Sequence, residues 1–157
     1  MALLQWNQLA AMNRHYVHYS LRDFFSTQQK LGIREICLWA GAPHLLLDDE
    51  SRPDATALLA LAGEYGLSIR VLAPECTLYQ YFINSWNETA REKALGYFTQ
   101  AILLTQELGA RVMLVNCGGG AKDMSEVQAQ QHAVQMLKRL GAVAAQHLSL
   151  IHISEPT

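Results

Sequence analysis

The sequence has few of the features that mark disulfide-stapled or redox proteins. Of its 157 residues three are cysteines, Cys37, Cys76 and Cys117, an odd number without a CxxC pair. This usage argues against a disulfide framework and favours a reducing, cytoplasmic environment. We therefore expect the three thiols to behave as small buried hydrophobic groups near strand ends.

Basic runs and long apolar runs are also missing. The net charge is −2 and no cluster of Lys or Arg occurs, so we expect no nucleic-acid partner. No apolar stretch approaches the roughly 20 residues that span a bilayer, so we expect no membrane partner. The first residues, MALLQWNQLAAM, lack the basic region that opens a signal peptide.

Half of the residues are apolar and 17% are charged, which is typical of a globular domain. Short apolar runs alternate along the chain with segments of helical period. The runs cover residues 7–12, 36–39, 69–73 and 112–115. They are continuously apolar rather than alternating, as expected for a parallel sheet covered by helices.

Each run is followed by a helix signal. Ser20 and Asp23 have the spacing of a capping box, and Ser51 precedes Pro53 as a cap with proline in the first turn. The remaining caps and terminal glycines are Asn87, Ser125, Gly32, Gly66 and Gly109. Four strand–helix units predict either an open doubly wound sheet or part of a (β/α)8 barrel. The open sheet would place its strands out of sequence order, with helices on both faces.

Both architectures bind ligands at the carboxyl ends of their strands. The segments that follow the four runs are NRHYVHYS, AGAPHLLLDD, PECTLYQYF and NCGGGAKD. They are long and polar or aromatic, whereas reverse-side connections such as GIRE and GLS are short. This asymmetry predicts a small polar ligand at the face where the long loops lie.

Three side chains in these loops are candidate ligand contacts. Trp39 ends a strand run and serves either as core filler or as a ligand platform. His44 lies in a Gly-Ala-Pro-His turn that orients it, with a merely solvated imidazole as the alternative. Glu75 follows Pro74 at a strand end, where a carboxylate points into the mouth of the sheet unless it is simply solvated.

Two further motifs are weaker. His15 and His18 suit a metal only if their loop is helical. The glycines 118–120, with Lys122, could hold a phosphate through backbone N–H groups, but the GxxxxGK[ST] pattern of a P-loop is absent. A flexible turn is the plainer interpretation of the glycines.

The segment EICLWAGAPH, residues 35–44, resembles the second strand of the xylose-isomerase-like TIM barrels. The similarity is to the sugar phosphate isomerase/epimerase family, in the branch of fructoselysine 3-epimerase and the ketose 3-epimerases. The segments APE (73–75), NETARE (87–92) and ELGA (107–110) fit the same pattern. The resemblance runs from about residue 7 to residue 147.

The resemblance implies a divalent metal, Mn, Mg or Co, that holds vicinal oxygens of a ketose or ketosamine. Two carboxylates then move a proton beside the carbonyl through an enediolate. In this family the metal ligands and the acid–base pair come from strands five to eight, and a full barrel takes about 250 residues. The chain therefore resembles the N-terminal half, about four βα units, of a truncated TIM barrel. We expect an inactive fragment that binds no metal, from a parent that can be a homo-oligomer.

On this resemblance, Trp39, His44 and Glu75 form a substrate-side wall for a small sugar, and the fragment holds no catalytic residue. The endonuclease branch of the same superfamily is an alternative. The acidic balance and the lack of basic loop residues disfavour it. A half barrel also leaves its first and fourth strands as open edges, which predicts self-association.

The last ten residues, LSLIHISEPT, raise a separate question. Glu155 and Pro156 fall where the fifth strand of the family ends in a metal-binding Glu-Pro. However, the helix before them has no terminal glycine, and His152 would lie mid-strand. The decapeptide resembles the translation of a sequencing adaptor, CTG TCT CTT ATA CAC ATC TCC GAG CCC ACG. We therefore predict a barrel domain over residues 1–147 and a read-through tail over residues 148–157, with the native gene continuing past His147.

Overall fold

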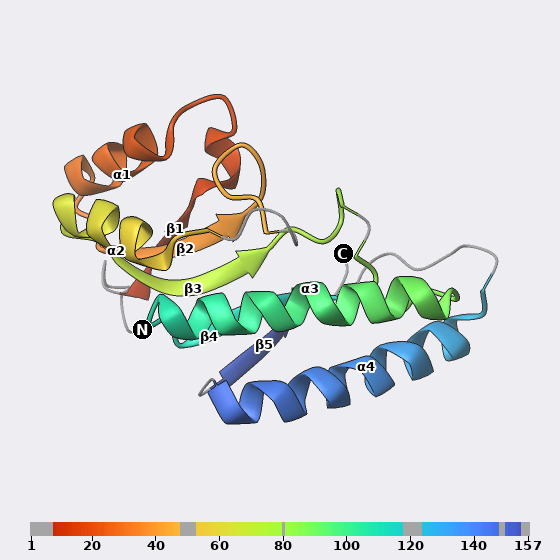
Figure 1. The fold of residues 1–157 in the computed structure, drawn as a ribbon. Helices are drawn as coiled ribbons and strands as arrows, with labels where there is room; N and C mark the ends of the chain where they lie inside the picture. Colours follow the sequence, from red (N-terminus) through yellow and green to blue (C-terminus); the bar gives the residue numbers. More distant parts are fainter. Residues whose placement is uncertain (1–7, 48–52, 80, 118–123, 148–149, 155–157) are drawn as a thin grey trace, which may run out of the picture.

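The computed structural model describes residues 8–47, 53–79, 81–117, 124–147 and 150–154. Within these residues five β-strands alternate with four α-helices, and one 3-10 turn follows the first strand (Figure 1). The elements are β1 (Ala10–Met12), η2 (Asn13–Tyr16), α1 (Leu21–Lys30), β2 (Glu35–Ala40), α2 (Ala55–Glu64), β3 (Ser68–Pro74), α3 (Glu88–Glu107), β4 (Val112–Asn116), α4 (Glu126–His147) and β5 (Leu150–Ser154).

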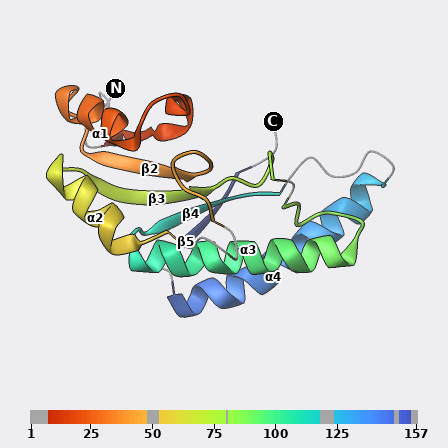
Figure 2. The same ribbon diagram turned by 45° about the horizontal axis from the view of Figure 1, so that its top comes forward.

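The strands form one parallel sheet in the order β1-β2-β3-β4-β5. Strand order equal to sequence order is the arrangement of a β/α barrel, in which each helix returns the chain to the next strand. Figure 2 shows α3 and α4 on the same side of the sheet. The predicted barrel topology is confirmed, and the doubly wound alternative is wrong.

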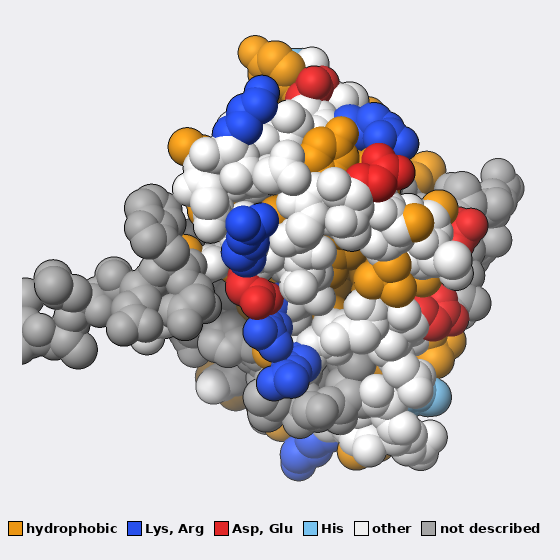
Figure 3. All heavy atoms as spheres, turned by 90° about the vertical axis from the view of Figure 1, so that its left-hand side faces the viewer, with side chains coloured by type: hydrophobic (Ala, Val, Ile, Leu, Met, Phe, Trp, Pro, Cys, Tyr) orange, Lys and Arg blue, Asp and Glu red, His pale blue; other side chains and the backbone are white. Residues whose placement is uncertain are grey.

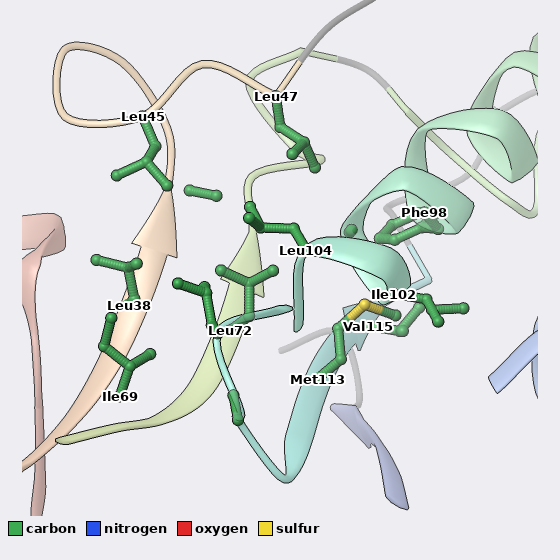
Figure 4. Packing of buried hydrophobic residues seen from close by; sticks show 14 of the residues in the cluster. Leu38, Leu45, Leu47, Ile69, Leu72, Phe98, Ile102, Leu104, Met113 and Val115 are labelled. Carbon is green, nitrogen blue, oxygen red and sulfur yellow. The ribbon is translucent and has the colours of Figure 1, made fainter. Parts of the chain in front are cut away.

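The main core lies between the sheet and the helices. Leu38 of β2, Leu72 of β3 and Met113 of β4 project into it, and Phe98 and Ile102 of α3 belong to the same cluster (Figure 4). All five are fully buried. Burying one such side chain contributes about 1.5–3 kcal/mol, so this layer holds the sheet and helices together. Because successive strand residues point to opposite faces, the two residues on either side of Leu38 in β2 point to the other face of the sheet.

The start of α1 confirms the predicted capping box. The Asp23 N–H donates to Ser20 Oγ at 3.0 Å, and the Ser20 N–H donates to Asp23 Oδ2 at 3.2 Å. Hydrogen bonds from Ser20 also lower the pKa of the Asp23 carboxyl. The predicted Asn87 cap is confirmed as well, because its Oδ1 accepts from the Ala90 N–H at 3.1 Å.

The predicted start of the second helix is wrong. The cap of α2 is Asp54, whose Oδ1 accepts from the N–H groups of Thr56 at 2.8 Å and Ala57 at 3.1 Å. A carboxylate next to the first turn can accept from two backbone donors at once, which favours it as the cap. Ser51 lies outside the described residues.

The first three helices end at glycines, as predicted. Gly32, Gly66 and Gly109 have φ angles of 75°, 64° and 63°. A residue with a side chain is strained in this left-handed region, so glycine allows the chain to leave the helix sharply.

The prediction that the fourth strand is an open edge is wrong, because β4 pairs along its whole length with β5. The edges of the described sheet are β1 and β5. Strand β5 falls within the segment predicted to be a read-through tail. Parallel pairing uses backbone groups that almost any sequence offers, so it does not separate native from foreign residues. Glu155 and Pro156 lie outside the described residues, and the domain boundary at 147 stays a prediction.

Figure 3 shows the end of the molecule at the amino ends of the strands, where positive and negative side chains are interspersed. Two ion pairs join neighbouring elements. Arg22 Nη1 lies 2.7 Å from Glu64 Oε2, and Arg70 Nε lies 2.9 Å from Glu35 Oε2. Within the described part of the chain, no helix has the length and apolarity needed to cross a membrane.

Candidate functional site

Four polar or aromatic side chains meet at the carboxyl ends of the first three strands. Asn13 begins η2 directly after β1, Trp39 lies near the end of β2, His44 lies in the turn after β2, and Glu75 follows β3. Asn13, Trp39 and Glu75 are buried, with exposed fractions of 0%, 4% and 4%. Direct hydrogen bonds connect all four, so they form one network, which we call the mouth network.

The Asn13 side chain binds both the backbone N–H and the backbone carbonyl of Trp39. Its Oδ1 accepts from the Trp39 N–H at 2.7 Å, and its Nδ2 donates to the Trp39 carbonyl at 3.1 Å. The ladder between β1 and β2 ends earlier, at the pair Met12 and Cys37. The amide side chain therefore continues the strand pairing and holds the end of β2 in place.

Glu75 accepts three hydrogen bonds from N–H donors. Trp39 Nε1 donates to Oε2 at 2.9 Å, and the backbone N–H groups of Thr77 and Leu78 donate to Oε1 at 2.7 and 2.9 Å. Three donors offset the cost of burying a carboxylate, since bonds to a charged acceptor are the strong ones. Tyr97 donates its hydroxyl to the Glu75 carbonyl at 2.6 Å, and burial raises the pKa of this phenol, so it stays a donor.

His44 is held at both ring nitrogens. Its Nδ1 lies 2.9 Å from Asn13 Nδ2, and its Nε2 lies 2.8 Å from the Tyr19 carbonyl. The two bonds to Trp39 orient the Asn13 amide so that Nδ2 is a donor, and Nδ1 of His44 must therefore accept. Nε2 then donates to the Tyr19 carbonyl, so both ring nitrogens are engaged.

Gly41 fits closely against the Trp39 ring. A Cβ at this position would lie 2.1 Å from Trp39 Cζ2, far inside any real contact distance. The indole therefore lies over the backbone of Gly41, and only glycine leaves room for it. This contact aims Trp39 Nε1 at Glu75.

The structure brings together all three site residues predicted from the sequence. Trp39 is buried like core filler but also carries a polar link, and Glu75 is not a solvated side chain. Their contact with a substrate stays a prediction. Sequence reasoning missed Asn13; its only signal was its place as the first polar side chain after the β1 run.

The pair His15 and His18 finds no support as a metal site. His15 lies in the single 3-10 turn η2, and His18 lies beyond it. Among the residues that the structure describes, no group of three or more His, Cys, Asp or Glu side chains could hold a metal ion. Glycines 118–120 and Lys122 lie outside the described residues.

The mouth network itself does not fit a metal ion. The two oxygens of Glu75 are directed at N–H donors, and both ring nitrogens of His44 are engaged. A cation would have to displace these donors and then face them. The network can instead act as a rigid polar wall, in which Glu75 Oε2 accepts from Trp39 Nε1 and keeps a second lone pair for a ligand hydroxyl.

Parallel strands in sequence order, joined by helices, and a polar network at their carboxyl ends define a β/α-barrel protein. The chain belongs to the xylose isomerase-like TIM barrel family, whose family model matches residues 27–153. A comparison with curated proteins finds no match to this sequence.

Solved structures with the same fold include sugar epimerases. The 3-keto-D-glucoside 4-epimerase from E. coli is 16% identical, with a TM-score of 0.71 over 92% of this chain and 54% of its own. D-psicose 3-epimerase from Clostridium cellulolyticum H10 is 16% identical, with a TM-score of 0.64 over 83% and 45%. L-ribulose 3-epimerase is 15% identical, with a TM-score of 0.66 over 94% and 46%. The chain spans about half the length of these structures.

Proposed function

We propose that this chain forms the sugar-binding first half of a metal-dependent isomerase or epimerase that acts on a ketose or ketosamine. The observation that carries the proposal is the buried mouth network, at the end of the sheet where barrels bind their ligands. Its rigidity supports a role in positioning, because a preorganised wall loses little entropy when a sugar binds. Membership of the family and the epimerase structures of the same fold support the class of reaction.

Within this proposal, Trp39 and His44 form the wall against which a small sugar lies. Glu75 accepts a hydrogen bond from one sugar hydroxyl through Oε2. None of these residues moves the proton in the reaction, because each is held by partners inside the network. A divalent metal, when bound to the full barrel, would stabilise negative charge on the sugar oxygens, and its ligands would come from other strands.

The proposal is tested by extending the gene and by assaying both proteins. Genomic DNA beyond the codon for His147 should encode further strand–helix units with Glu, Asp, His and Glu at four strand ends. The extended protein, with Mn²⁺, should exchange the proton beside the carbonyl of a ketose into D2O, measured by proton NMR. The 157-residue chain should show no exchange under the same conditions.

Two results would count against the proposal. Exchange catalysed by the 157-residue chain itself would show that the other half is not needed. If an extended protein folds but exchanges no proton in any ketose or ketosamine, the proposed class of reaction is wrong. In the extended protein, the substitution Glu75→Gln should raise KM more than it lowers kcat. A decrease in kcat with unchanged KM would contradict a positioning role for Glu75.

A further inference from the structure

Two cysteines outside the mouth network follow neighbouring strands at corresponding positions. The register of β3 and β4 pairs Val71 with Val112. Cys76 and Cys117 each lie five residues beyond this pair. The paired register ends at Leu72 and Met113, and the two cysteines lie in the segments that follow these neighbouring strands. A disulfide between them requires a Cα separation of about 4.4–6.8 Å.

The described contacts agree with this placement. Cys76 Sγ lies 3.6 Å from the carbonyl oxygen of Asn116, the residue that precedes Cys117. Burial is the main reason that the pKa of the Cys76 thiol is raised, and the neighbouring charges of Glu75 and Cys117 raise it further. The Cys76 side chain is therefore directed toward the end of β4.

The two thiols differ in access, and the third cysteine is separate from them. Cys76 is buried and Cys117 is partly exposed, so an oxidant in solution reaches Cys117 first. Cys37 is in the middle of β2, where it pairs with Met12 of β1 and Val71 of β3, and burial raises its pKa to about 11. It therefore serves as an internal control.

We propose that Cys76 and Cys117 are a redox-modification site that closes reversibly to an intramolecular disulfide. The oxidant is a low-molecular-weight disulfide such as oxidised glutathione. The Cys117 thiolate attacks one glutathione sulfur, the glutathione S–S bond breaks, and one glutathione leaves as a thiol. The Cys76 thiolate then attacks the Cys117 sulfur of the mixed disulfide and releases the second glutathione. Two thiol protons and two electrons pass from the protein to the oxidant.

This bond would join the chain directly beside the mouth network. Cys76 follows Glu75, whose carboxylate holds Trp39 and whose carbonyl accepts from Tyr97. Closing the bond ties this segment to the end of β4 and restricts the network.

The test uses the whole chain in its native state with oxidised glutathione, followed by peptide mapping under non-reducing conditions. We expect a cross-linked peptide pair containing Cys76 and Cys117, lighter by two hydrogens and restored by dithiothreitol. Cys37 should remain a thiol. Because the Cys76 pKa is raised, the closing step should speed up about tenfold per pH unit through the neutral range.

Variants separate the two steps. In Cys76→Ser the reaction should stop at glutathione on Cys117, whereas the matched control Cys37→Ser should close like the original chain. Accumulation of glutathionylated Cys117 without cross-link in the original chain would overturn the proposal. So would disulfide-linked dimers as the main product, or a cross-link that forms only in urea. The map of the original chain decides the question even if a variant does not fold.

Discussion

The bond between Trp39 and Glu75 provides a test of the mouth network that requires no substrate. In Glu75→Gln the side chain keeps one acceptor oxygen but gains an amide that can only donate. If its oxygen faces the backbone N–H groups of Thr77 and Leu78, its amide faces the N–H of Trp39. A charge-assisted bond is then replaced by two opposed buried donors.

The expected cost follows from these contacts. Loss of a hydrogen bond to a charged group costs about 1.5–3 kcal/mol, and leaving a buried donor unpaired costs about 1–3 kcal/mol. Part of the second cost is recovered if the side chains shift. We therefore expect Glu75→Gln to lower the free energy of unfolding by about 3 kcal/mol.

A double-mutant cycle isolates the pair. In Trp39→Phe the indole N–H is absent, so the amide introduced by Glu75→Gln would meet no opposing donor, and the two substitutions should couple by about 1–2 kcal/mol. The assay is urea unfolding followed by circular dichroism, which does not depend on the tryptophan signal. Glu64→Gln, at a site where the side chain is 53% exposed, is the matched control and should change stability by less than about 0.5 kcal/mol. Additive effects of the two substitutions would refute the reasoning.

Three further predictions concern other contacts. Gly41→Ala should cost about 1–3 kcal/mol in urea unfolding and shift the indole N–H resonance of Trp39, because the new Cβ displaces the ring; an unshifted resonance would contradict this. Asn87→Ala should cost about 1 kcal/mol by removing the α3 cap, while Asn87→Asp should retain most of the stability in the same assay. The hydrogen bond from Arg139 lowers the pKa of Glu92 below its usual 4.5, so this pair stabilises the fold above that pH and its contribution is lost as pH falls through the lowered pKa. Glu92→Gln should therefore reduce the difference in Tm between pH 7 and pH 3, and an unchanged difference would show that the pair is inert.

The fold could be predicted from the sequence because its signals are local. Apolar runs of strand length, the capping box at Ser20 and the glycines after three helices each act within a few residues. The prediction that Ser51 caps α2 was wrong. Several adjacent side chains could cap this helix, and which of them does so depends on the geometry of the turn. The prediction of an exposed edge at β4 was also wrong, because backbone pairing with β5 requires no recognisable sequence pattern.

Only part of the candidate site could be predicted from the sequence. Trp39, His44 and Glu75 could be selected because they follow strand runs, and parallel strands bring such positions to one end of a sheet. Nothing in the sequence indicates that Asn13 binds the backbone of Trp39, since these residues lie 26 positions apart. The orientation of the His44 ring depends on Asn13 in turn.

By itself, the amino-acid sequence determined the succession of strands and helices, the family resemblance and the end of the sheet where a ligand would bind. Periodicity, capping and chain order act along the chain, so they can be recognised without coordinates. Only the tertiary structure decided that Glu75 is a buried acceptor of three N–H groups and that His44 is held at both ring nitrogens. Only the tertiary structure also showed that Gly41 must lack a side chain. These properties depend on atoms at and just beyond the carboxyl ends of β1, β2 and β3 meeting within hydrogen-bond or contact distance, and the packing of the sheet establishes this.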